Sequence, residues 1–174
     1  MSHTIKRIEQ KGSNNSELRT DNMRLQIIVQ QKVALAISFL LCGCAIYLLF
    51  RSKTLNIYHW CATLGFSSAI DTLRLWVQNW NVPDFVRFCL PDGLYSAAYI
   101  LLIDAIWHKE KGIMKNIIIS LVPIVTISSE LLQIFGIIRG TFDLYDLLCY
   151  TFPPLVYLSI KYYQNLTLKL QKLK

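Results

Sequence analysis

Charged residues are scarce in this 174-residue chain, where they make up 17% of the total, against roughly a quarter in an ordinary soluble domain. Hydrophobic residues make up 53%, and the mean hydropathy is +0.37. A chain with so little charge does not have the composition of a typical water-soluble domain. The balance favours an integral membrane protein.

Several kinds of functional site are also missing from the sequence. The five cysteines form no C-x-x-C pair, and the three histidines are scattered, so no zinc-type cluster can be written and no metal site of that kind is predicted. No glycine-rich phosphate loop or nucleophile elbow is present, and the cofactor is left undetermined. The net charge of +7 arises from basic residues at the ends of apolar runs, so nucleic acid is not an expected partner.

Four long apolar runs are present, and each approaches the ~20 helical residues that cross a bilayer. They are Val33–Phe50, Phe88–Trp107, Ile117–Ile138 and Leu144–Ile160. The predicted fold class is therefore all-α, an integral membrane protein with four transmembrane helices. Segment 1–32 is expected to be a polar cytoplasmic tail, with no cleaved signal peptide. Its first part, Met1 to about Asn22, is too polar to bury anything and is expected to be mobile.

The basic residues predict the orientation of these runs. Thirteen of the 18 fall in three clusters, which lie before the first run, between the second and third, and after the fourth. Since basic residues mark the cytoplasmic side, four spans place all three clusters and both termini in the cytoplasm, as in a multi-pass protein of a bacterial inner membrane. Segment 161–174 spaces Tyr162, Leu166 and Leu170 at helical intervals among lysines, which predicts a basic amphipathic helix on the inner leaflet.

The stretch Ile57–Trp80 is apolar enough to suggest a fifth span, but it contains Asp71 and Arg74. Its three tryptophans suit the interface between lipid and water. We therefore expect one or two helices that lie against the outer leaflet, with Asp71 and Arg74 paired one helical turn apart. A broken fifth span is the alternative.

Polar residues gather where the third and fourth runs meet. Glu130 lies deep in the third run, and Gln133 follows on the same helical face. Asp143 and Asp146 share the first turn of the fourth helix, where the positive helix end favours carboxylates. Ionised groups inside a membrane are costly unless they are paired or hydrated, and they usually mark a functional site. The structural alternative is that these groups hold two helices in register.

Further polar residues are expected near this site. Arg139 lies between the acids in the chain and is expected to bridge them, while Thr141 is expected to cap the fourth helix. Asp92, at the start of the second run, lies at a similar depth and is expected to join the group. Asp104 stands apart near the cytoplasmic end, where we expect it to reach water or to pair with Lys109.

The order Glu130-x-x-Gln133, Arg139, Asp143, Asp146 resembles the signature of the VanZ-like membrane proteins. The segment LPDGLYSAAYILLIDAIW is similar to the second span of a bacterial subgroup of that family. The resemblance covers residues 33–160 and implies a VanZ-like transmembrane domain there. After the second aspartate the family usually continues with a glycine-rich helix. Here CYTFPP follows, and its two prolines are expected to kink the fourth helix.

The family is named for a protein that confers low-level resistance to a glycopeptide antibiotic. The resemblance therefore implies a protein that binds or modifies a lipid-linked or other cell-envelope component at the outer leaflet, without deciding whether it is an enzyme. In an enzyme, Glu130 would be the general acid or base, and close carboxylates could hold Mg²⁺. The substrate-binding residues would be Gln133, Arg139, Asp143, Asp146 and Asp92.

The alternative function is that of a non-catalytic membrane effector or scaffold. Such a protein would form a homo-oligomer, perturb the bilayer or assist a partner enzyme, for example in a defence system. The polar leader and the basic C-terminal segment favour this alternative. A transporter is less well supported, because four spans without an internal repeat give little basis for alternating access.

Overall fold

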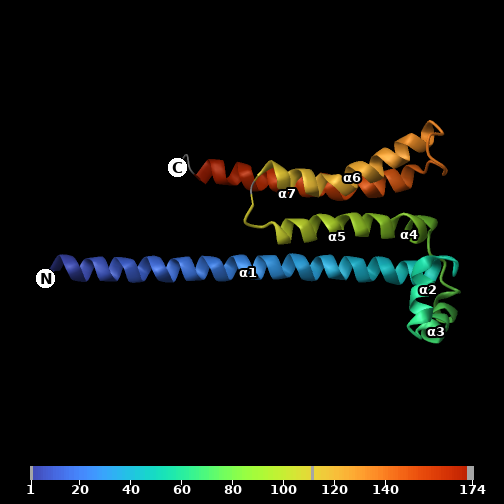
Figure 1. Cartoon of the computed structure of the whole chain (residues 1–174), viewed down its shortest axis with the longest axis horizontal. Helices are drawn as coiled ribbons and strands as arrows, with labels where there is room; N and C mark the ends of the chain where they lie inside the picture. Colours follow the sequence, from blue (N-terminus) through green and yellow to red (C-terminus); the bar gives the residue numbers. More distant parts are fainter. Residues whose placement is uncertain (1, 111, 172–174) are drawn as a thin grey trace.

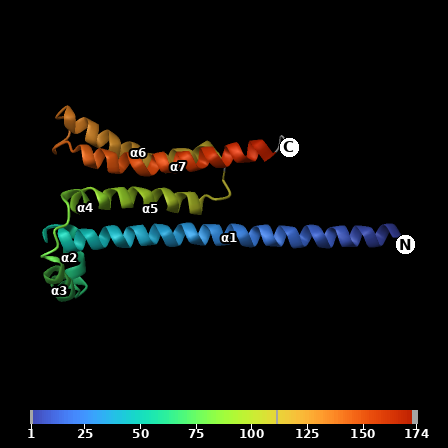
Figure 2. The same cartoon turned by 180° about the vertical axis from the view of Figure 1, so that it is seen from behind.

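The computed structural model describes residues 2–110 and 112–171, and these form helices and no strands. The all-α class is thereby confirmed. Four long helices lie side by side, with α5 packed against α1, α6 and α7, and three shorter helices lie near one end (Figures 1 and 2). In chain order the helices are α1 (Ser2–Phe50), α2 (Asn56–Thr63), α3 (Ser67–Val77), α4 (Asp84–Phe88), α5 (Leu90–Ile106), α6 (Ile113–Ile134) and α7 (Leu144–Gln171).

Two helical stretches in the described part of the chain are long and apolar enough to cross a membrane. They are Asn22–Phe50, within α1, and Ile113–Ile134, which is the whole of α6. In the most apolar 18-residue stretch of each, only 11% and 17% of the residues are buried inside the protein. The core helix of a soluble protein would be mostly covered, so these helices are better suited to face lipid.

The first helix is longer than predicted. α1 runs for 49 residues without interruption, so segment 2–32 is helical and continuous with the first apolar run, in place of the expected mobile tail. The segment contains no proline and a single glycine, and many of its residues are good helix formers. Its N-terminal part extends beyond the ends of the other helices (Figure 1).

Residues 57–80 form two short helices, α2 and α3, which confirms their predicted helical character. Eight and 11 residues reach about 12 and 16 Å, far less than the ~30 Å of a bilayer core. Gly65 separates them with a φ of 83°, and the adjacent backbone hydrogen bonds are those of a helix that ends in glycine. Both helices lie at the end of α1 and to its side, so they do not form a fifth bundle helix (Figures 1 and 2).

α6 ends at Ile134, four residues before the predicted end at Ile138. Gly136 has a φ of 66°, and the N–H groups of this residue and the next bond back to helix carbonyls at 3.0 and 3.1 Å. This is the Schellman arrangement, which stops a helix at a left-handed glycine. Glu130 therefore lies in the last turn of α6. The prediction that it lies deep within the helix is wrong.

α7 begins at Leu144, as predicted, and runs through Pro153 and Pro154 to Gln171. The expected amphipathic segment 161–174 is thus a continuation of α7, with residues 172–174 outside the described range. Tyr162 and Leu170 on this part are 67% and 57% exposed. The protein leaves this apolar surface uncovered, which suits a helix in contact with a membrane.

Two glycines allow α5 to approach its neighbours closely. A Cβ atom at Gly43 of α1 would lie 3.0 Å from the ring of Tyr95, and one at Gly93 of α5 would lie 3.2 Å from the carbonyl oxygen of Cys149. Small residues at such positions are typical of packed membrane helices. Both termini lie at one end of the bundle, and the α6–α7 turn lies at the other (Figure 1).

Candidate functional site

Four carboxyl groups and one thiol gather at the end of the bundle that carries the α6–α7 turn. The first turns of α5 and α7 and the last turn of α6 position the acids, and Glu130 interacts electrostatically with the other three. The structure thus brings together the acids that the sequence had placed near one another. We call this group the acidic corner: Cys89, Asp92, Glu130, Asp143 and Asp146.

Glu130 is the buried acid that α6 contributes to the acidic corner. It is only 7% exposed. Its Oε1 accepts a hydrogen bond from Gln133 Nε2 at 3.5 Å, whereas Oε2 is buried without a hydrogen-bond partner among the described residues. The backbone of Asp143 also interacts with this carboxyl group. Because Glu130 lies at the C-terminal, negative end of α6, the helix dipole does not stabilise its charge.

Gln133 is held in place by the turn that follows α6. A Cβ atom at Gly140 would lie 2.9 Å from Gln133 Cδ, so the side chain of Gln133 packs directly against that glycine. Gly140 also has a φ of 152°, a conformation that favours glycine. The turn therefore fixes the amide that bonds to Glu130.

Asp143 and Asp146 lie at the start of α7. Asp143 Oδ1 accepts a hydrogen bond from the N–H of Tyr145 at 2.8 Å, so Asp143 is the N-cap. The prediction that Thr141 caps this helix is wrong, because Asp143 immediately precedes the first helical residue. Asp146 Oδ1 is buried without a hydrogen-bond partner in the part of the chain that the structure describes.

Cys89 completes this part of the acidic corner and was not predicted from the sequence. Its side chain is 2% exposed and its thiol interacts with Asp146. One ligand atom each from Cys89, Asp143 and Asp146 lies within 4.8 Å of the others. The residue immediately precedes α5, two positions before Pro91, and this adjacency is the only sequence signal that could have indicated its location.

Two tyrosines hold Asp92, and neither was predicted. The hydroxyl of Tyr47, near the end of α1, donates to Asp92 Oδ1 at 2.9 Å, and Tyr150 of α7 also bonds to this carboxylate. A tyrosine hydroxyl in an apolar helix needs a polar partner, which is the signal that could have found them. Arg51 stacks over the ring of Tyr47 at 4.9 Å and donates to the carbonyl of Phe88 at 2.9 Å.

Arg139 does not bridge the acids, so that prediction is wrong. It is exposed in the turn after α6, and among the described residues no lysine or arginine forms an ion pair with any acid of the corner. The early end of α6 at Gly136 moves Arg139 out of the helix and into the turn. Within the described ranges, the acids of the corner therefore have no ion-pair partner, and Arg51 acts only electrostatically on Asp92.

Asp104 forms the opposite arrangement at the other end of the bundle. The predicted pair with Lys109 is wrong, because Lys109 is exposed and the carboxylate of Asp104, only 3% exposed, is surrounded by other lysines. The hydroxyl of Tyr157 also donates to it at 2.9 Å. Three lysine Nζ atoms lie close to the oxygens of Asp104: that of Lys32 from α1 at 2.5 Å, that of Lys115 from α6 at 2.7 Å and that of Lys161 from α7 at 3.3 Å. We call this group the lysine cluster.

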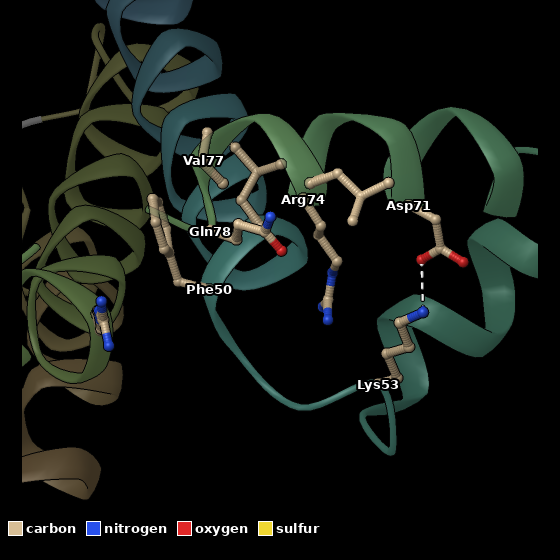
Figure 3. A pocket seen from close by; sticks show the side chains of 9 residues that line it. Phe50, Lys53, Asp71, Arg74, Val77 and Gln78 are labelled. Carbon is tan, nitrogen blue, oxygen red and sulfur yellow. Dashed lines mark ion pairs between the residues drawn. The ribbon is translucent and has the colours of Figure 1, made fainter. Parts of the chain in front are cut away.

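A pocket of about 550 Å³ lies between the end of α1 and α3 (Figure 3). Lys53 and Asp71 form an ion pair of 2.7 Å on one side of it. Lys53, together with the hydroxyl of Tyr58, holds the pKa of Asp71 below its usual range, and Asp71 raises the pKa of Lys53. Both groups are therefore charged at neutral pH.

Arg74 reaches from α3 into the same pocket (Figure 3). Its Nε donates to the carbonyl of Leu48 at 2.6 Å and a terminal nitrogen donates to that of Arg51 at 2.7 Å. Arg74 thus caps the carboxyl end of α1, and the predicted pairing with Asp71 is replaced by the Lys53–Asp71 pair. Since these cations already have partners, the pocket is better explained as the joint between α1 and α3 than as a binding site.

No family model, curated protein or solved structure matches this chain. The resemblance to the VanZ-like signature therefore stays a prediction that rests on the order and spacing of five residues. What the structure contributes is the geometry: the acids and Gln133 meet, and Arg139 does not join them.

Proposed function

We propose that this chain is a four-span protein of a bacterial inner membrane, VanZ-like in type, that binds or modifies a cell-envelope component at the acidic corner. The observation that carries the proposal is the buried Glu130. Its Oε2 has no hydrogen-bond partner among the described residues, and the three acids beside it form no ion pair with a described lysine or arginine. Buried polar groups are normally satisfied, and an unsatisfied acid inside a membrane usually serves function.

The four spans would be α1, α5, α6 and α7. α5 has 17 residues and covers about 26 Å, close to the ~30 Å of a bilayer core. An even number of spans accounts for both termini at one end of the bundle (Figure 1). Because the lysine cluster lies at that end, the positive-inside bias favours a cytoplasmic position for it. The acidic corner would then face the outer leaflet, with α2 and α3 at its interface.

Cysteine labelling tests this topology. In a variant with Cys42, Cys44 and Cys61 replaced by serine, a membrane-impermeant maleimide applied from outside should label a cysteine placed at Asn79. It should not reach cysteines placed at Gly112 or Gln171 until the membrane is permeabilised. External labelling at both Asn79 and Gln171 would refute four spans with cytoplasmic termini.

The chemistry of the corner suits a ligand with hydrogen-bond donors and an anionic group. The free oxygens of Glu130 and Asp146 can accept bonds from sugar hydroxyls or amide N–H groups. Arg139, which is exposed and not paired with the acids, can hold a phosphate or carboxylate through two parallel bonds. In a reaction, Glu130 would transfer the proton, while Gln133 and Asp92 would position the ligand.

Native mass spectrometry tests the proposed binding. Protein extracted from its own bacterial membrane should retain an envelope lipid, seen as a defined mass added to the chain. Asp146→Asn should lose most of this adduct, because one acceptor becomes a donor. Asp84→Asn is the matched control, since Asp84 is exposed on the neighbouring α4, and it should retain the adduct. Equal retention by both variants would contradict the proposal.

A scaffold role is the second candidate, and one observation favours it. The N-terminal part of α1 extends past the other helices, where another copy of the chain or a partner could pack along it (Figure 1). A scaffold would form defined oligomers and lose them when residues 2–21 are deleted, while substitutions in the acidic corner would have no effect on assembly.

A further inference from the structure

The acidic corner contains a mixed group of ligand atoms that the sequence alone did not suggest. The sulfur of Cys89 and one carboxylate oxygen each from Asp143 and Asp146 lie within 4.8 Å of one another. In a tetrahedral zinc site the ligand atoms are about 3.3–3.8 Å apart, given bonds of about 2.0–2.3 Å. The three groups would have to close by about 1 Å, a shift that side-chain rotation can supply.

A second observation, independent of this cluster, indicates that something positive belongs there. Glu130 is only 7% exposed, and its Oε2 has no hydrogen-bond partner among the described residues. The same carboxyl group interacts with both Asp143 and Asp146. At the other end of the same bundle, a single buried carboxylate has three lysines. No described lysine or arginine forms an ion pair with Glu130, Asp143 or Asp146. Since this protein supplies cations to a buried acid elsewhere, that arrangement fits a site whose cation comes from solution.

We propose that the acidic corner binds a divalent cation of the zinc class through Cys89, Asp143 and Asp146, with Glu130 beside the open coordination position. Three protein ligands and one open position are typical of catalytic zinc. The thiol must lose its proton, so the S–H bond breaks, the sulfur–metal bond forms and the proton passes to solvent. The exposed turn between α6 and α7 provides the entry path.

The identity of the ligands selects the class of metal. Mg²⁺ and Ca²⁺ prefer six or more oxygen ligands, for which a buried thiol is a poor substitute. Zinc and its analogue Co²⁺ accept sulfur and oxygen together in a site of four ligands. This inference rests on the proposed function, because the metal would then orient or activate the bound envelope component.

Cobalt provides a direct test, because thiolate bonding to Co²⁺ produces a charge-transfer absorption band in the near ultraviolet. Purified full-length protein in nanodiscs should bind one Co²⁺ per chain with this band, and Zn²⁺ should displace it. Cys89→Ser should abolish the band. Cys149→Ser is the matched control, because Cys149 is also buried in the same region but outside the cluster, and it should keep the band.

A second variant guards against misfolding of Cys89→Ser. Asp143→Asn retains the helix cap, since asparagine caps as well as aspartate does, and it should keep the band while binding Co²⁺ at least about tenfold more weakly. Absence of the band in the folded wild type, or its persistence in Cys89→Ser, would overturn the metal site. If the protein retains the envelope lipid but binds no cobalt, the metal site is refuted and the proposed function stands. If it binds cobalt but retains no lipid, the proposed function is refuted and the metal site stands.

Discussion

Asp104→Asn is expected to lower the free energy of unfolding by about 3–5 kcal/mol, the cost of removing one partner from a buried ion pair. The carboxylate is 3% exposed and lies between lysines of three other helices. Asparagine keeps the size but removes the charge, so the lysines repel one another at the point where α1, α5, α6 and α7 meet. Chemical or thermal denaturation in a fixed detergent measures the loss.

Two further variants separate this mechanism from a general packing defect. Lys161→Met should cost much less, because Lys161 is the farthest of the three at 3.3 Å and two lysines remain. Adding Lys115→Met to Asp104→Asn should recover part of the stability, since it removes a buried charge that has lost its carboxylate and keeps only backbone carbonyls as partners. A wild-type melting curve for Asp104→Asn would show that the lysine cluster does not stabilise the bundle.

Glu130→Gln is expected to abolish retention of the envelope component while leaving the melting temperature equal to that of the wild type or slightly higher. The amide keeps the shape of the side chain but cannot carry the charge or transfer the proton. Removing a buried carboxylate also removes its desolvation cost, so stability should not fall. Native mass spectrometry and thermal unfolding on the same preparations measure both effects.

The combination of results decides between a functional and a structural role for Glu130. If the acid mainly held α6 against α7, its replacement would lower the melting temperature and affect binding only through misfolding. Gln133→Leu serves as a comparison, because it removes the bond to Oε1 but leaves the carboxylate in place. A Glu130→Gln protein that retains both its stability and its adduct would favour the scaffold role.

The fold class and the pairing of Glu130 with Gln133 could be predicted because both depend on local sequence. Apolar runs of helical length identify the long helices, and residues three positions apart, such as Glu130 and Gln133, must share a helical face. The start of α7 was also predictable, since carboxylates are favoured at a helix N-terminus. These features need no knowledge of how the helices pack.

The remaining features depend on contacts between segments that are distant in the chain. Lys32 meets Asp104 across 72 positions, and Tyr47 meets Asp92 across 45, and neither pairing has a local signal. The end of α6 was misplaced because the run of apolar residues continues beyond it, whereas the backbone at Gly136 ends the helix. That single difference moved Glu130 to the last turn and Arg139 out to the exposed turn.

An experimental density map of the wild-type protein in nanodiscs of its own membrane lipids tests the central claim most directly. The proposal predicts non-protein density in contact with Glu130 and Asp146, at the bundle end that faces the outer leaflet. It also predicts that this density is lost in Glu130→Gln while the helices keep their positions. A map in which the acidic corner faces the cytoplasm, or in which protein side chains fill it completely, would contradict the proposal.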